Sequence, residues 1–161
     1  MPQLVKGGKH VFGWTLVGDK GKIIIPPEAL EEYGLRESDK LIMIPGSKTS
    51  GGFGLGTQKI LKESPLGTVL DANPALKNFR VSEKEVIEYR GKPYCWTKLI
   101  NQGISVPPDT LKRYGIEVGD RLLVIRGSGL ALGFAVRGPI VEEAGKHPEL
   151  KVFCQTGENN G

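Results

Sequence analysis

Few residues in this chain can support acid–base, nucleophilic or metal chemistry. The 161 residues include two histidines and two cysteines, and Cys95 and Cys154 form no Cys-x-x-Cys pair. Gly-x-Ser-x-Gly, His-Glu-x-x-His and Walker-type sequences are also absent. The segment Gly46–Thr49 shares residues with part of a phosphate-binding loop, but it lies at a predicted hairpin and not before a helix. We therefore expect no enzyme activity, no metal site and no cofactor.

Long hydrophobic runs are missing as well. Runs such as Ile23–Ile25 and Leu122–Ile125 are far too short to span a bilayer, and residues 1–10 lack the apolar stretch of a signal peptide. Two cysteines are too few for a disulfide scaffold, so we expect reduced thiols. A cytoplasmic protein is the expectation.

Glycine and proline are plentiful and point to a β-rich chain. The sequence holds 23 glycines and 11 prolines, placed between short apolar runs, with 39% hydrophobic and 25% charged residues. This composition predicts a globular, mostly β fold. The net charge of +4 permits nucleic-acid binding without demonstrating it.

The strongest signal in the sequence is an internal duplication. From Pro26 to Phe53, 12 of 28 positions are identical to the residues 81 positions further along. Upstream, Trp14 and Thr15 match Trp96 and Thr97 at an offset of 82, so the second copy is one residue shorter near its turn at Gln102. Each copy predicts a strand around its tryptophan, a turn, an apolar strand, a Pro-Pro helix start, and two further strands.

The duplication divides the chain into four segments. Repeat one covers 9–58, a connector covers 59–91, repeat two covers 92–137, and a tail covers 138–161. In the connector, prolines suggest irregular chain at first, and Ser82–Glu85 predicts a capping box that starts a short helix ending by Gly91. In the tail, we expect a helical turn at Ile140–Ala144 and a frayed end at 158–161.

The short helix of each copy is predicted from its boundaries. Pro27 suits the first helical turn, where its missing amide would have no partner anyway. Leu30 and Tyr33 share one helix face, and Gly34 is expected to end the helix in the left-handed conformation. The same residues recur in the second copy at Leu111, Tyr114 and Gly115. Trp14 and Trp96 are expected to be core anchors.

The order of residues in repeat one resembles the AbrB/MazE/SpoVT family. That order is Gly-Lys, three aliphatics, Pro, a short helix, Tyr-Gly, Asp and an aliphatic strand. Here it reads Gly21–Pro26, Tyr33–Leu35 and Asp39–Leu41, and the second copy matches from Ile104 onward. The resemblance implies a swapped-hairpin β-barrel, with one short helix per repeat and a small helical connector beside it. We expect the two repeats to form one pseudo-dimeric barrel within a monomer. Pairing between two chains of a homodimer is the alternative.

The resemblance also implies duplex DNA as the partner and transcription regulation as the function. Two family positions carry the basic residues: the residue after the turn glycine, and a pair early in the helix. Repeat one keeps the turn cation, Lys22, but has Glu31 and Glu32 near its helix positions. Repeat two lacks the turn cation but has Lys112 and Arg113. The candidate DNA-binding residues are Lys20, Lys22, Lys98, Lys112 and Arg113.

Two other functions stay open at this point. In the first, the fold is a scaffold or protein-interaction module without DNA affinity, with its partner surface on the connector or the tail. An antitoxin-like component is the second alternative, in which residues 139–161 would be disordered and wrap a toxin. The apolar run Val152–Cys154 argues against that, because it suits packing on the fold.

Overall fold

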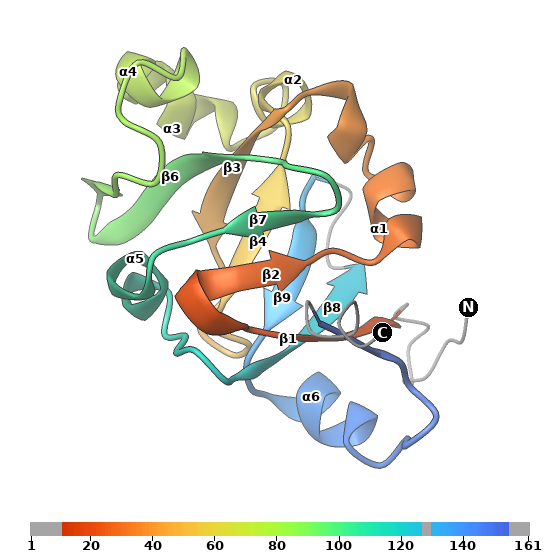
Figure 1. Ribbon diagram of the computed structural model, residues 1–161. Helices are drawn as coiled ribbons and strands as arrows, with labels where there is room; N and C mark the ends of the chain where they lie inside the picture. Colours follow the sequence, from red (N-terminus) through yellow and green to blue (C-terminus); the bar gives the residue numbers. More distant parts are fainter. Residues whose placement is uncertain (1–10, 127–129, 155–161) are drawn as a thin grey trace.

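The structure is a computed structural model that describes residues 11–126 and 130–154 (Figure 1). Both repeats fold into the same order of elements. Repeat one gives β1 (Val11–Leu16), β2 (Lys22–Ile24), α1 (Pro27–Glu32), β3 (Lys40–Pro45) and β4 (Phe53–Gly56). Repeat two gives β6 (Lys92–Lys98), β7 (Gly103–Ser105), α5 (Pro108–Arg113), β8 (Arg121–Arg126) and β9 (Leu132–Ala135). Repeat one also has two short 3₁₀ helices, η1 (Asp19–Gly21) and η2 (Leu35–Glu37).

The predicted helix boundaries are confirmed. Both helices begin at the second proline of the Pro-Pro pair, and each ends at its tyrosine. Gly34 has a φ of 61°, which is the expected left-handed conformation. The buried face of α1 carries Ala29 and Leu30, and that of α5 carries Thr110 and Leu111. Local sequence therefore sets where each helix starts, where it stops and which face it buries.

The strand pairings join each repeat to the other. β1 pairs with β8 antiparallel, with Trp14 opposite Leu123, and β3 pairs with β6 in the same way, with Ile42 opposite Trp96. β2 pairs with β7, and β4 pairs with β9. Among the described strands, the β3–β4 and β8–β9 hairpins are the pairings formed within one repeat. The hydrogen bonding thus interleaves the two halves within a single chain.

Equivalent residues of the two repeats meet at the centre, which places a pseudo-two-fold axis there. Ile23 lies opposite Ile104 in the β2–β7 ribbon, and Phe53 lies opposite Phe134 between β4 and β9. The two phenylalanine rings stack with centroids 4.6 Å apart and an interplanar angle of 14°. All four side chains are buried in the central hydrophobic cluster. The core therefore depends on both repeats, because each supplies half of its central contacts.

The expected closed barrel is not found among the described residues. The strands form an eight-stranded sheet in the order β10-β1-β8-β9-β4-β3-β6-β5, and β2 and β7 form a separate ribbon. The outer edges of β1 and β6 are occupied by β10 (Val152–Phe153) and β5 (Ile87–Tyr89). These extra strands come from the tail and the connector. The sheet ends on them and does not close through the ribbon, which crosses its front face (Figure 1).

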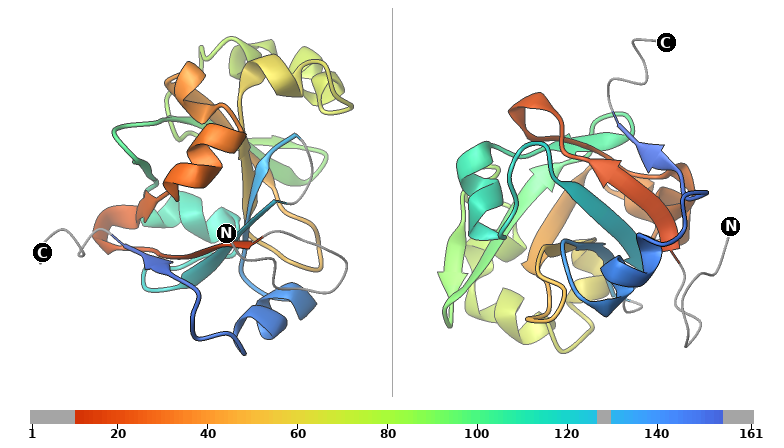
Figure 2. Two further views of the ribbon diagram at one scale, coloured as in Figure 1. Left: turned by 90° about the vertical axis from the view of Figure 1, so that its right-hand side faces the viewer. Right: turned by 90° about the horizontal axis from the view of Figure 1, so that it is seen from below.

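The fold is mixed α/β and not mostly β as expected, because the segments outside the repeats are largely helical. The connector forms α2 (Gln58–Leu61), α3 (Gly67–Ala72) and α4 (Pro74–Lys77), and the tail forms α6 (Pro139–Ala144). α6 confirms the predicted helical turn, while α2–α4 replace the irregular chain that the prolines suggested. Figure 2 shows the connector helices and α6 on the side of the sheet away from the β2–β7 ribbon.

These helices cover the two tryptophans, which are anchors as predicted. Trp96 is buried in a cluster with Leu61, Leu70 and Leu76 from the connector. Trp14 is buried in a second cluster with Ala144 and Leu150 from the tail. The duplicated strands therefore offer the same apolar face twice, and each copy covers it with a different segment.

The predicted helix after Ser82 is wrong. Lys84 has a φ of 72°, which a right-handed helix excludes, and the chain continues into β5. The Glu83 carboxylate is bound to β6. It accepts a hydrogen bond from the Lys98 backbone N–H at 2.8 Å and one from Thr97 Oγ1 at 3.2 Å. Pairing with β6 therefore overrides the local capping signal.

In the described ranges, no helix is long and apolar enough to cross a membrane. The tail packs on the sheet up to residue 154, through α6 and β10. The predicted turn at Gly127 and Ser128, and the predicted frayed end at 158–161, lie outside the described residues.

Candidate nucleic-acid interface

The interleaving brings the turn of repeat one against the helix of repeat two. The Val106 backbone N–H donates to Gly21 O at 3.0 Å, and Ser105 Oγ donates to Lys20 O at 3.4 Å. Val106 leads directly into Pro107 and α5. Lys20 and Lys22, on the turn and the start of β2, are therefore next to the helix that carries Lys112 and Arg113. The two partial basic surfaces seen in the sequence belong to one half of the molecule.

The opposite half joins the turn of repeat two to the helix of repeat one. The Ile25 backbone N–H donates to Gln102 O at 2.9 Å, and Gln102 Nε2 donates to Ile25 O at 3.1 Å. The turn carries no cation, and α1 exposes the three carboxylates Glu28, Glu31 and Glu32. Figure 1 shows α1 and α5 near opposite ends of the β2–β7 ribbon. The ribbon thus has a basic end at α5 and an acidic end at α1.

Charge counts support this division. The basic end holds Asp19 and Asp109 besides its four cations, so cations exceed carboxylates by two over η1, β2 and α5. Residues 100–103 and α1 together hold three carboxylates, while Arg36 donates to Asn101 O at 3.1 Å and Arg126 pairs with Glu32, so carboxylates exceed cations by one there. At the acidic end, burial and then the Glu32 carboxylate raise the pKa of Tyr33 to about 12. A phosphate backbone would be attracted to one end and repelled by the other.

The candidate residues differ in how accessible they are. Lys20 and Lys112 are exposed, and Lys22 is half-buried on β2, facing a depression of about 290 Å³ between β2 and β7. Arg113 Nη2 contacts Glu88 Oε2 at 2.9 Å, and both side chains are largely exposed. An exposed ion pair of this kind is worth about 0–1 kcal/mol, so a phosphate can compete for Arg113.

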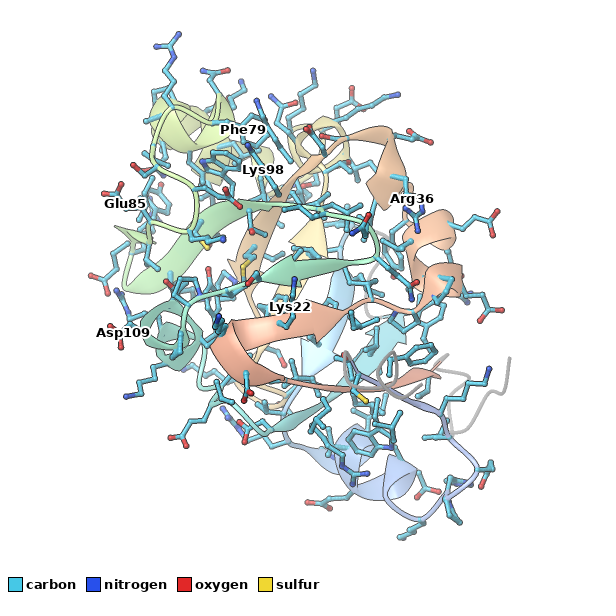
Figure 3. All side chains as sticks on the ribbon, viewed as in Figure 1. Lys22, Arg36, Phe79, Glu85, Lys98 and Asp109 are labelled. Carbon is cyan, nitrogen blue, oxygen red and sulfur yellow. The ribbon has the colours of Figure 1, made fainter. Side chains whose placement is uncertain are left out.

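Lys98 does not join the other four. It lies at the end of β6, opposite Lys40 in the register, and Glu83 binds its backbone N–H. Figure 3 shows Lys98 beside Phe79 at the connector side of the molecule, while Lys22 lies on the β2–β7 ribbon. Lys98 and Lys22 are both predicted from the sequence to contact DNA phosphates. The structure separates them by carrying β6 away from β2.

Sequence reasoning missed three cations that adjoin the basic end. Lys48, Lys92 and Arg137 line a depression together with Arg113. They come from three segments that no single motif links. Only the fold brings them together, and the partial resemblance of Gly46–Thr49 to a phosphate loop was the one local signal near them.

Among the described residues, no group of three or more His, Cys, Asp or Glu side chains is arranged to hold a metal ion. Comparison with family models, with curated proteins and with solved structures gave no match for this chain. The geometry and charge of the chain itself are therefore the basis of its proposed function.

Proposed function

We propose that this chain is a DNA-binding transcription regulator of the AbrB-like type, and that it contacts duplex DNA through the basic end of the β2–β7 ribbon. The observation that supports this most is the meeting of the Lys20–Lys22 turn with α5. Four cations on adjacent elements match the spaced negative charges of a phosphate backbone. The interleaved strand pairing also supports the swapped-hairpin class, in an arrangement whose sheet stays open.

The charge division makes the proposed contact asymmetric. In a homodimer both halves would be identical, and both would face DNA with the same charge. Here the α1 end presents Glu28, Glu31 and Glu32, so it is expected to lie off the DNA. One DNA half-site is then enough for binding. Arg113 or Lys112 is the residue best placed to reach a base edge from the short helix. The proposed target is a single asymmetric site without palindromic repetition.

Fluorescence anisotropy with a mixed-sequence DNA duplex, titrated at several salt concentrations, tests the proposal. We expect binding that weakens steeply with salt, with a slope of about −0.9 per phosphate contact. Lys22→Gln and Lys112→Gln should each weaken binding and reduce the slope by about one contact. Lys59→Gln, an exposed lysine on α2, is the matched control and should leave both unchanged.

Either of two results would overturn the proposal. No salt-dependent binding at low ionic strength would show that the basic end does not bind DNA. Equal losses from Lys59→Gln and Lys22→Gln would show only general attraction to a positively charged protein. A third variant, Glu31→Gln, tests the asymmetry: it should change affinity little if the α1 end lies off the DNA.

A further inference from the structure

Beside the basic end, a depression of about 310 Å³ opens between the β3–β4 turn, the start of β6 and the end of α5. Among the described residues, the lining of this depression includes Lys48, Lys92, Arg113 and Arg137, and no carboxylate. Glu88 pairs with Arg113 and has a side chain that is 62% exposed. The depression therefore has a clear excess of positive charge.

One of the four cations is held in place by the fold. Arg137 Nη2 donates to the backbone oxygen of Lys48 at 3.0 Å, which ties the guanidinium to the β3–β4 turn. It lies so close to the turn that a Cβ on Gly51 would sit 2.6 Å from Arg137 Nη1. The glycine makes room for the arginine. A guanidinium fixed in this way loses less freedom when it binds an anion than a free side chain would.

The other half of the molecule shows that this charge is not a general property of the fold. The position of Arg113 is taken there by Glu32, and that of Pro45 by Arg126. Arg126 Nη2 donates to Glu32 Oε1 at 2.9 Å, in an ion pair that joins the helix end of repeat one to β8 of repeat two. The equivalent place is thus neutralised by an internal pair. In the α5 half, the cation Arg113 replaces the carboxylate and pairs instead with Glu88, whose side chain is 62% exposed.

We propose that this depression binds a small anion that carries at least two phosphoryl groups. Arginine presents a fork of N–H donors that suits phosphate oxygens, and lysine adds compact point charges. Four cations exceed what one phosphate would need. A volume of about 310 Å³ is near the lower limit of small-molecule sites, which fits a compact polyphosphate. This site goes beyond the proposed DNA contact and does not depend on it, although Arg113 borders both.

Isothermal titration calorimetry with inorganic tripolyphosphate, at constant ionic strength, tests the site on the full chain. Arg137→Gln and Lys48→Gln should each weaken binding about tenfold or more, because each removes a charge-assisted hydrogen-bond donor. Lys59→Gln and Lys62→Gln remove the same charge from α2 and should leave affinity within about twofold. All four side chains are exposed, so thermal unfolding should confirm that every variant is folded.

Sulfate and monophosphate at the same ionic strength complete the test. We expect both to bind much more weakly than tripolyphosphate. No heat with tripolyphosphate, equal binding of sulfate, or equal losses from the α2 control variants would each overturn the site.

The outcome is separable from that of the DNA experiment. Lys20→Gln and Lys22→Gln, which lie outside the lining, should keep tripolyphosphate binding while they weaken DNA binding. Failure of the anion titration alongside salt-dependent DNA binding would reject the depression and retain the interface. Anion binding without DNA binding would retain the depression and reject the interface.

Discussion

Replacing Gly21 by alanine tests whether the two repeats interleave in solution as they do in the structure. Gly21 has a φ of 75°, and a Cβ there would sit 1.7 Å from the backbone oxygen of Val106 in the other repeat. Backbone atoms cannot move aside as a flexible side chain can. The Gly21→Ala variant must therefore separate β2 from the start of α5 or distort the turn.

Gly115 provides a matched control within the same chain. Its φ is 78°, but a Cβ there would have no atom within 4 Å. Gly115→Ala should thus lower the free energy of unfolding by about 1 kcal/mol, because alanine disfavours the left-handed conformation. Gly21→Ala should lower the free energy of unfolding by about 3 kcal/mol, because an overpacking penalty adds to the same conformational penalty. For a domain of this size, we expect the Tm to fall by about 2–4 °C in Gly115→Ala and by about 6–12 °C in Gly21→Ala.

Thermal unfolding followed by circular dichroism, repeated at two protein concentrations, measures both variants. If Gly21→Ala is no less stable than Gly115→Ala, the contact between Gly21 and Val106 does not exist and the interleaving is wrong. If the Tm of the unsubstituted protein rises with protein concentration, the repeats pair between chains, as the homodimer alternative requires.

Two further predictions concern titratable groups. Hydrogen bonds to Glu149 and then Glu143 raise the pKa of His147, so its stabilising contribution is fully present below pH 6.5 and is lost as pH rises through the raised pKa. An NMR titration should give a pKa above 6.5 that falls in Glu149→Gln, and an unchanged value in that variant would contradict the contact. Burial raises the pKa of Cys95 to about 11, so iodoacetamide at neutral pH should label it only after denaturation. Mass spectrometry measures this, and rapid labelling of Cys95 in the native protein would show that the strand β6 is not packed as described.

The sequence was sufficient to predict the features that depend on local chemistry. In each repeat, the Pro-Pro pair, the tyrosine on the buried helix face and the glycine after it lie within nine residues of one another, and they define α1 and α5 without contacts from elsewhere. The capping signal at Ser82 failed for the opposite reason. Glu83 finds its partners on Lys98 and Thr97, some 15 residues away, and no local pattern indicates that pairing.

The open sheet could not be predicted for a similar reason. Closure depends on what occupies the outer edges of β1 and β6, and both edges are taken by segments outside the repeats. β10 is two residues long, and β5 lies where the sequence indicated a helix. The candidate site shows the same limit. The sequence identified Lys22 and Lys112 as two incomplete surfaces, and only the strand pairing shows that they adjoin.

That adjacency gives the duplication a physical consequence. In a homodimer of identical chains, a carboxylate gained on the helix appears in both halves, so one half cannot become basic while the other becomes acidic. Fusion of the two copies removes that constraint. The turn of repeat one lies against the helix of repeat two. The positive charges of Lys22, Lys112 and Arg113 therefore add to the same end of the ribbon. Glu31 and Glu32 do not reduce the positive charge of that end, because they lie at the other end of the ribbon. The charges that form two incomplete basic surfaces in the sequence form, in the folded chain, one basic end and one acidic end of the β2–β7 ribbon.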